Sequence, residues 1–131
     1  MSLASLILLT ASSAFSLPPG LLSAVCYVES RHKIDAIHRE DGHGDSLGMC
    51  QIKLSTARWL GYKGSPAKLW KDPRVNAHWA AKYLRYQIKR YKGDILCGVS
   101  AYNAGSCHKA AGKIRNTNYI KLVFKSWIER K

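Results

Sequence analysis

Residues 17–31 of the chain read LPPGLLSAVCYVESR. The Pro-Pro-Gly segment at 18–20 interrupts any preceding helix, and the residues after it repeat their apolar side chains at helical spacing. The pattern predicts a helix over about residues 21–31, with a broad apolar face against a hydrophobic core and a carboxyl group, Glu29, near its end. The apolar positions of that face are Leu21, Leu22, Val25, Cys26 and Val28.

The chain after this helix continues in short segments with helical rather than alternating periodicity, which predicts an all-α fold. A polar, glycine-containing loop at 38–46 is expected to face solvent. A short helix is expected over about 55–60, ended by Gly61. Residues 62–71 are expected to form a loop.

The second half of the chain carries clear helix starts. The Asp-Pro pair at 72–73 predicts the longest helix, which is expected to stop near Gly93. Asp94 is expected to cap a further helix that reaches about Asn103, and Asn118 to cap the last one. No repeat or linker separates these segments, so we expect a single globular domain.

Size and charge limit the possible functions. The chain has 131 residues, 47% of them hydrophobic, which is enough for one compact domain with its own core. Lysine and arginine total 21 against 8 aspartates and glutamates, a formal net charge of +13. This charge favours a polyanionic partner such as nucleic acid, an anionic membrane or a bacterial envelope polymer. It is equally typical of a small domain kept soluble by its charged surface.

The N-terminal run LASLILLTASSAF at 3–15 is apolar, and the first thirty residues contain no lysine or arginine. We favour the interpretation of residues 1–16 as a signal peptide, which leaves residues 17–131 as the domain. The alternative is a first core helix, since the basic start of a signal peptide is missing. About thirteen apolar residues are fewer than the ~20 that span a bilayer, so we expect no stable membrane anchor.

The four cysteines allow three disulfide connectivities, and both free core thiols and one disulfide are compatible with the sequence. No pair has CxxC spacing and no histidine lies at ligand spacing beside one, so we expect no metal and no cofactor. The run at 41–45 lacks the length and the terminal glutamate of an EF-hand, so we expect a solvated loop there. The cysteines are Cys26, Cys50, Cys97 and Cys107.

Glu29 is the candidate general acid. It lies four residues after Val25 and seven after Leu22, which places its carboxyl on the same side of the helix as buried aliphatic side chains. Removal from water disfavours the charged carboxylate and raises its pKa, as proton donation at neutral pH requires. The alternative is a glutamate at the edge of the helix that is either solvated or paired with Arg31. The other acidic residues fall in the polar loop, at helix caps or in the tail, so Glu29 is expected to work alone.

Four motifs carry a resemblance to a known family. The Glu-Ser pair at 29–30 follows an apolar helix as the catalytic Glu-Ser does in soluble lytic transglycosylases. SLGMCQI at 46–52 is similar to the Gly-Leu-Met-Gln-Ile segment of that family, and AYNAG at 101–105 matches its Ala-Tyr-Asn-Ala-Gly. The Asn-Tyr-Ile segment at 118–120 resembles the late Tyr-Val of the family. In this order the motifs cover about residues 18–125, and the chain resembles the soluble lytic transglycosylase (SLT domain) family of the lysozyme-like superfamily.

The resemblance implies a lysozyme-like domain that cuts peptidoglycan glycan strands without water. Glu29 would protonate the oxygen between N-acetylmuramic acid (MurNAc) and N-acetylglucosamine (GlcNAc), then act as base on the muramoyl C6 hydroxyl to give a 1,6-anhydro ring. Tyr102 is implied to orient the carboxyl of Glu29. Among the tryptophans, we expect Trp70 in the groove, and Trp79 and Trp127 in the core. The implied substrate-binding residues are Ser46, Gln51, Tyr102, Asn103 and Tyr119.

Two other functions stay open. A goose-type lysozyme would cut the same bond with water, assisted by a loop carboxylate such as Asp41 or Asp45. A non-enzymatic domain would bind polyanions, but no nucleic-acid motif accompanies its cationic helix face, so we expect no specific nucleic acid. That face consists of Lys82, Arg85, Lys89, Arg90 and Lys92. The lytic interpretation implies an exported monomer in the periplasm or cell envelope, or in a phage virion, placed by a phage, secretion or conjugation assembly.

Overall fold

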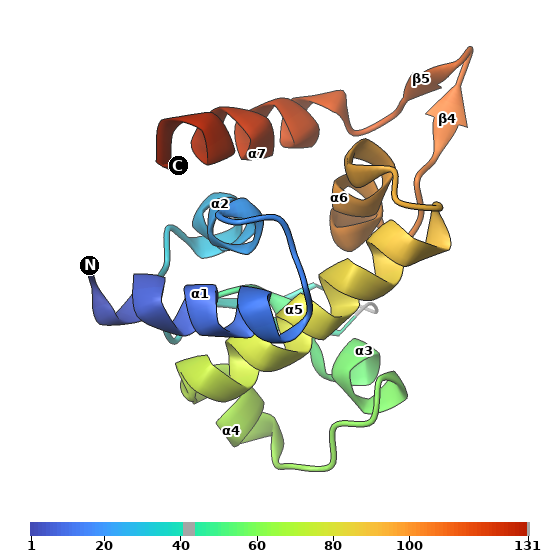
Figure 1. Ribbon diagram of the computed structural model, residues 1–131. Helices are drawn as coiled ribbons and strands as arrows, with labels where there is room; N and C mark the ends of the chain where they lie inside the picture. Colours follow the sequence, from blue (N-terminus) through green and yellow to red (C-terminus); the bar gives the residue numbers. More distant parts are fainter. Residues whose placement is uncertain (41–43, 131) are drawn as a thin grey trace.

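The computed structural model describes residues 1–40 and 44–130, and it is built mainly of helices (Figure 1). The longest helix, α5, crosses the middle of the molecule and contacts α1, α4 and α6, while α2 packs between α1 and α7. The helices are α1 (Leu3–Ala14), α2 (Leu21–Ser30), α3 (Leu54–Trp59), α4 (Pro66–Lys71), α5 (Pro73–Arg90), α6 (Ile95–Ala104) and α7 (Thr117–Arg130).

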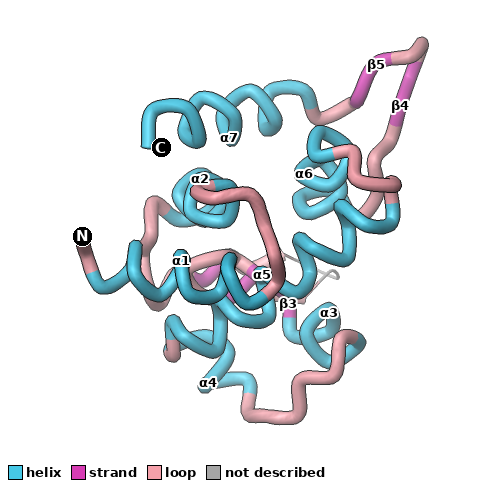
Figure 2. The backbone as a smooth tube through the Cα atoms, viewed as in Figure 1, coloured by secondary structure: helices cyan, strands magenta, loops and turns pink. Residues whose placement is uncertain are grey.

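Short strands interrupt the helices, so the all-α prediction holds only approximately (Figure 2). Three of them form an antiparallel sheet in the order β1-β2-β3, in which Ser46 lies opposite both His38 and Lys53. The expectation that the whole of 38–46 faces solvent is wrong at Ser46, which is buried because the sheet folds it inward. The strands are β1 (Ile37–His38), β2 (Ser46–Leu47), β3 (Ile52–Lys53), β4 (Lys109–Ala110) and β5 (Lys113–Ile114).

The predicted helix starts are confirmed for the two central helices. The Asp72 carboxylate accepts the backbone N–H of Arg74 at 3.0 Å at the start of α5, and Asp94 accepts that of Cys97 at 3.1 Å at the start of α6. These bonds satisfy N–H groups that have no partner inside a helix. Helix α3 also agrees with its predicted position before Gly61.

Two helix boundaries differ from the prediction. Residues 62–71 are not a continuous loop, because Pro66 occupies the first position of α4 and the Ser65 hydroxyl accepts the N–H of Lys68 at 3.1 Å. This is the serine cap with a following proline that begins many helices. Asn118 does not cap α7, since that helix already begins at Thr117.

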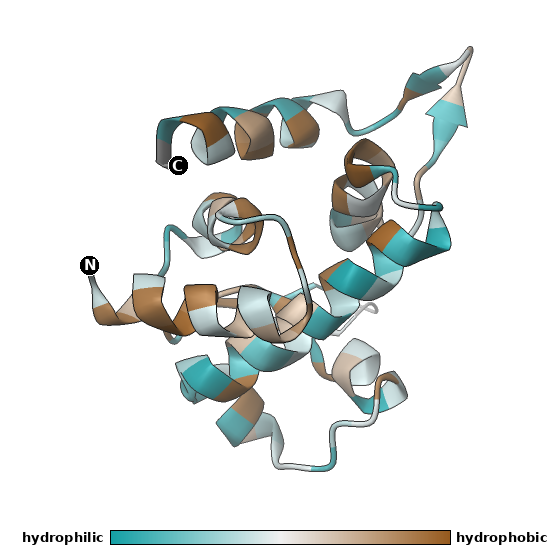
Figure 3. Ribbon diagram, in the orientation of Figure 1, coloured by the Kyte–Doolittle hydropathy of each residue, from teal (hydrophilic) through white to brown (hydrophobic). Residues whose placement is uncertain are grey.

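The N-terminal apolar segment forms α1, which lies against α2 and α5 with Ile7, Leu8 and Ala11 buried. Figure 3 shows apolar residues gathered on α1, α2 and α6, whereas α5 alternates between apolar and hydrophilic positions. Removal of residues 1–16 as a signal peptide stays a prediction. None of the helices in the described part of the chain combines the length and the apolar character needed to cross a bilayer.

All four cysteines are paired in two disulfides, whereas free thiols or a single bridge were expected. Cys26 of α2 is bonded to Cys50, and Cys97 of α6 is bonded to Cys107. The first disulfide joins residues 24 apart in the sequence and lies in the main core, where both of its cysteines are fully buried. It therefore attaches the helix that carries Glu29 to the segment that follows β2.

Candidate active site

Helix α2 presents Glu29 in its last turn, and two contacts fix this turn to the segment after β2. The hydroxyl of Ser30 donates to the backbone carbonyl of Met49 at 2.6 Å. One turn earlier, Cys26 forms its disulfide with Cys50. The Glu-Ser pair at 29–30 thus places a carboxyl in the site and, next to it, a hydroxyl that attaches α2 to the segment after β2.

The turn at 48–51 forms the floor next to Glu29 and depends on Gly48. Its φ of +76° favours glycine, and a Cβ there would overlap the side-chain amide of Asn76. Asn76 is fully buried and accepts the N–H of Cys50 at 2.8 Å while it donates to the Leu47 carbonyl at 2.8 Å. The amide nitrogen of Asn76 also donates to the Leu69 carbonyl of α4 at 2.9 Å, so Asn76 attaches the turn to α4.

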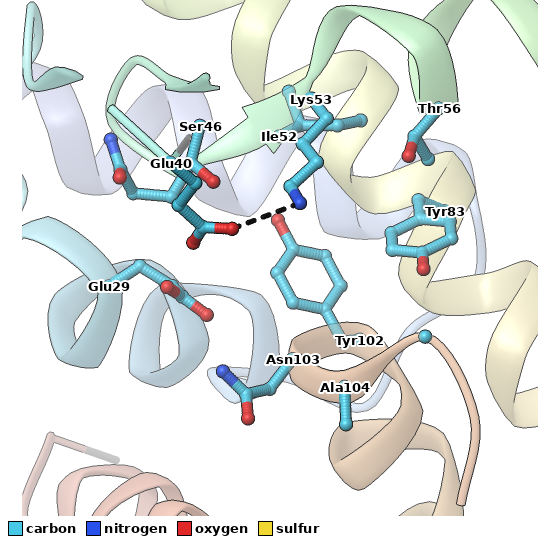
Figure 4. A pocket seen from close by; sticks show the side chains of 12 residues that line it. Glu29, Glu40, Ser46, Ile52, Lys53, Thr56, Tyr83, Tyr102, Asn103 and Ala104 are labelled. Carbon is cyan, nitrogen blue, oxygen red and sulfur yellow. Dashed lines mark hydrogen bonds and ion pairs between the residues drawn. The ribbon is translucent and has the colours of Figure 1, made fainter. Parts of the chain in front are cut away.

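A polar cleft of about 330 Å³ opens between α2, the three-stranded sheet and the end of α6 (Figure 4). Glu29 comes from α2, and Ser46, Gln51 and Lys53 come from the sheet and its turn. Tyr102 and Asn103 of α6 close the other side. The cleft therefore brings Glu29 together with Ser46, Gln51, Tyr102 and Asn103, four of the five residues that the sequence resemblance placed at the substrate.

The fifth residue, Tyr119 of α7, contacts the carboxyl itself. Its hydroxyl donates to Oε2 of Glu29 at 2.8 Å. Burial raises the pKa of Glu29 to about 7, a nearby negative charge on Glu40 adds to the rise, and the Tyr119 hydrogen bond opposes it. The desolvated setting predicted from helical spacing is confirmed, and Arg31 lies over the ring of Tyr27 rather than in an ion pair with Glu29.

Tyr102 does not orient the Glu29 carboxyl by a hydrogen bond, contrary to the sequence expectation. Its buried hydroxyl donates to the backbone carbonyl of Cys50 at 2.6 Å, because α6 brings the ring underneath the 48–51 turn. A carbonyl buried at this depth needs a donor, and Tyr102 supplies it. The orienting contact belongs instead to Tyr119.

Two further predicted residues have partners within the protein. The Gln51 amide donates to the carbonyls of Ala36 and Gly48 at 3.2 and 3.0 Å, so it stabilises the turn while lining the cleft. The Asn103 oxygen accepts from the Asn116 amide at 3.0 Å, and the Asn103 side chain is exposed. Both residues line the cleft.

Glu40 lies in the same cleft and was missed by the sequence analysis. Its carboxylate accepts from Nζ of Lys53 at 3.2 Å, and Nε2 of His38 lies 3.8 Å from its other oxygen. The polar loop therefore supplies a second carboxylate to the cleft, because the chain after β1 folds back over the sheet, and catalysis by Glu29 alone stays a prediction. No spacing in the sequence indicated this, since the pairing of such short strands is set by tertiary contacts.

The loop carboxylates considered for a hydrolytic mechanism lie elsewhere or outside the described residues. Asp45 pairs with Arg39 at 3.3 Å and does not line the cleft. Asp41 and most of the run at 41–45 fall in residues 41–43, outside the described part of the chain. Within the described residues, no group of three His, Cys, Asp or Glu side chains is arranged to hold a metal ion.

The tryptophan beside the cleft is not the one that was predicted. Trp79 and Trp127 pack against hydrophobic clusters, as expected, but Trp70 lies on α4 and its Nε1 donates to the Asp35 carbonyl at 2.7 Å, away from the cleft. Trp59 is 63% exposed and lines a shallow extension that shares Tyr83 with the main cleft. Trp59 is thus the tryptophan whose ring is available for stacking on a ligand.

A helical domain with a small antiparallel sheet, in whose cleft a partly buried, helix-borne glutamate has a raised pKa, is a lysozyme-like domain. The family model of the transglycosylase SLT domain matches residues 7–123. The chain belongs to this SLT domain family. The match includes α2, the 48–51 turn, α6 and the start of α7, and therefore every residue that contacts Glu29 above.

Several proteins are similar to the chain along most of its length. It is 30% identical over 118 residues to an X polypeptide of Escherichia coli, covering 88% of this chain and 69% of that protein. It is 32% identical over 117 residues to the X polypeptide of Escherichia coli strain K12, covering 88% and 66%. It is 31% identical over 113 residues to the uncharacterized 20.7 kDa protein in the vs-regB intergenic region of Enterobacteria phage T4, covering 77% and 61%. The chain thus spans about two thirds of the length of these curated relatives.

Proposed function

We propose that this protein is a peptidoglycan lytic transglycosylase that cleaves the β-1,4 bond between MurNAc and GlcNAc without water. The observation that carries the proposal is the buried carboxyl of Glu29, whose pKa of about 7 leaves it protonated in much of the population at neutral pH. A group of this kind can donate a proton to a glycosidic oxygen. Membership of the SLT domain family supports the choice of substrate.

The first step transfers the Glu29 proton to the glycosidic oxygen as the bond to the MurNAc anomeric carbon breaks. The GlcNAc hydroxyl leaves, and the carbonyl oxygen of the MurNAc N-acetyl group forms a bond to the anomeric carbon, which spreads the positive charge. The Tyr119 hydroxyl favours the resulting Glu29 carboxylate, because a donated hydrogen bond stabilises the charged form.

The second step uses the same carboxylate as a base. Glu29 removes the proton from the C6 hydroxyl of the same MurNAc, and O6 displaces the acetamido oxygen at the anomeric carbon. A 1,6-anhydro ring forms, and Glu29 is protonated again. Because the attacking hydroxyl is already part of the bound sugar, the reaction gains from proximity and consumes no water.

Hydrolysis is the second candidate, and the presence of Glu40 in the cleft favours it. A second carboxylate can activate a water molecule on the face of the sugar opposite the acid. We prefer transglycosylation because the Glu40 carboxylate is engaged by Lys53 and because the chain belongs to the SLT domain family. The products separate the two reactions, since an anhydro end is lighter than a hydrolysed end by one water.

The experiment is digestion of purified peptidoglycan by the protein and by its Glu29→Gln variant, followed by mass spectrometry of the soluble fragments. We expect anhydro-muropeptides from the wild type and none from the variant. Glutamine keeps the size of the side chain and an oxygen for Tyr119 to donate to, so the loss would reflect the missing proton. Full activity of the variant would refute the role of Glu29.

We further propose that the enzyme acts in the cell envelope, after export or from a phage virion. The relative in phage T4 supports the second route. Immunodetection of the protein in purified virions or in periplasmic extracts would decide between the two locations.

A further inference from the structure

Glu40 is the second carboxylate of the cleft, and its position is determined by Lys53. Glu40 follows β1, Lys53 ends β3, and the two strands flank β2 in the sheet. Their side chains meet above the cleft, with Nζ 3.2 Å from the carboxylate, and both groups are only about one-third exposed (Figure 4). The proposed chemistry of Glu29 uses neither of them.

Among the described residues, the titratable side chains that line the cleft with Glu29 are those of Glu40, Lys53, Tyr83 and Tyr102, and Tyr119 contacts Glu29 from α7. Tyr119 of α7 donates a hydrogen bond to it, and the ring of Tyr102 from α6 lies within the same cleft. Within the described part of the cleft lining, Glu40 and Lys53 carry full charges, one negative and one positive, and the His38 imidazole lies 3.8 Å from the Glu40 carboxylate. In Figure 4 the side chain of Glu40 lies next to that of Glu29, the first coming from the chain after β1 and the second from α2.

We propose that Glu40 and Lys53 are positioning residues of this active site, and that the carboxylate of Glu40, balanced by the ammonium of Lys53, controls how firmly Glu29 holds its proton. The inference rests on the proposed role of Glu29 as acid and base. A neighbouring negative charge makes a second negative charge on Glu29 less favourable, and a neighbouring positive charge does the opposite. The partly desolvated cleft makes both effects larger than they would be in water.

The same ion pair would also be present if its only role were to tie the loop after β1 to the sheet. The two roles predict different results. Loss of a structural tie affects the site similarly whichever partner is removed. Loss of a charge affects Glu29 in opposite directions, depending on which charge is removed.

The test is the dependence of glycan cleavage on pH for the full chain, for Glu40→Gln and for Lys53→Met. The wild-type rate is expected to fall above pH about 7 as Glu29 loses its proton. In Glu40→Gln this basic limb should move to lower pH by on the order of half a pH unit, and in Lys53→Met it should move to higher pH by a similar amount. Glu40→Asp, which keeps the charge, should leave the limb closer to that of the wild type than Glu40→Gln does.

The matched control is Asp45→Asn. It also removes a carboxylate from an ion pair in the same loop, with Arg39 at 3.3 Å, but this pair lies outside the cleft. Its basic limb should coincide with that of the wild type.

The proposal is overturned if either limb stays at the wild-type position or if both move in the same direction. It is also overturned if the wild type releases hydrolysed ends that Glu40→Gln abolishes, since Glu40 would then activate water. If Glu29→Gln is inactive and the basic limbs of Glu40→Gln and Lys53→Met coincide with that of the wild type, this inference is refuted and the proposed function is still supported.

Discussion

Replacement of Glu29 by glutamine should stabilise the folded protein above neutral pH while it removes activity. The carboxyl has a pKa of 4.5 in the unfolded chain and about 7 in the fold. Between these values the folded state holds a proton that the unfolded chain has released, so a rise in pH favours unfolding. The contribution of the protonated group is complete below pH 4.5 and is lost as pH rises through about 7.

The magnitude follows from the two pKa values. A difference of about 2.5 pH units corresponds to about 3 kcal/mol of folding free energy. Glutamine carries no charge at any pH and can still accept the Tyr119 hydrogen bond. The stability of the variant relative to the wild type should therefore increase by about 3 kcal/mol between pH 4 and pH 8.

Urea unfolding followed by tryptophan fluorescence measures this difference at both pH values. Subtraction of the variant from the wild type cancels the titration of all other groups. Glu129→Gln on α7 is the matched control, because it makes the same replacement at an exposed position outside the cleft. A Glu29→Gln difference that stays within about 1 kcal/mol from pH 4 to pH 8 would show that the carboxyl is not desolvated, and would refute this reasoning.

Three further changes test separate parts of the site. Tyr119→Phe removes the hydrogen bond that lowers the pKa of Glu29, so the basic limb of the pH–activity profile should move to higher pH. The maximal rate should fall about tenfold. An unchanged profile would show that Tyr119 does not act on the Glu29 carboxyl. Replacement of both Cys26 and Cys50 by serine should lower the free energy of unfolding by about 3 kcal/mol, because the disulfide closes a loop between residues 24 apart. Thermal or urea denaturation measures the difference. Equal stability of the variant and the wild type would contradict a stabilising role of the disulfide. Trp59→Ala should change the free energy of unfolding by less than about 0.5 kcal/mol, because the side chain is exposed. It should raise the KM for long glycan strands about tenfold, because the ring would no longer stack on a sugar. An unchanged KM would exclude a stacking role.

The sequence predicted the helices best where their ends carry local chemistry. Asp72 and Asp94 begin α5 and α6 as expected, because a cap is an interaction between residues two or three apart. The prediction that burial would raise the pKa of Glu29 held for a similar reason, since helical spacing alone places it beside Val25 and Leu22. The same rule missed α4, although Ser65 and the proline after it form a cap of the same kind.

The parts that failed depend on contacts between distant residues. Glu40 reaches the cleft only because β1 pairs with β2 and β2 with β3, each over two residues, a register that no periodicity shows. The hydrogen bond to Glu29, predicted for Tyr102 and found at Tyr119, has the same origin. Whether a tyrosine contacts a carboxyl or a buried carbonyl depends on how α6 packs on α5 and how α7 packs on α2, not on the motif around each residue.

The most direct test of the proposed function is the mass of the fragments released from peptidoglycan by the wild-type protein. Transglycosylation by Glu29 predicts glycan ends that carry 1,6-anhydro-MurNAc, lighter by one water than hydrolysed ends, and no incorporation of ¹⁸O from labelled solvent water. Fragments that end only in reducing MurNAc labelled with ¹⁸O would contradict the account and identify the enzyme as a hydrolase.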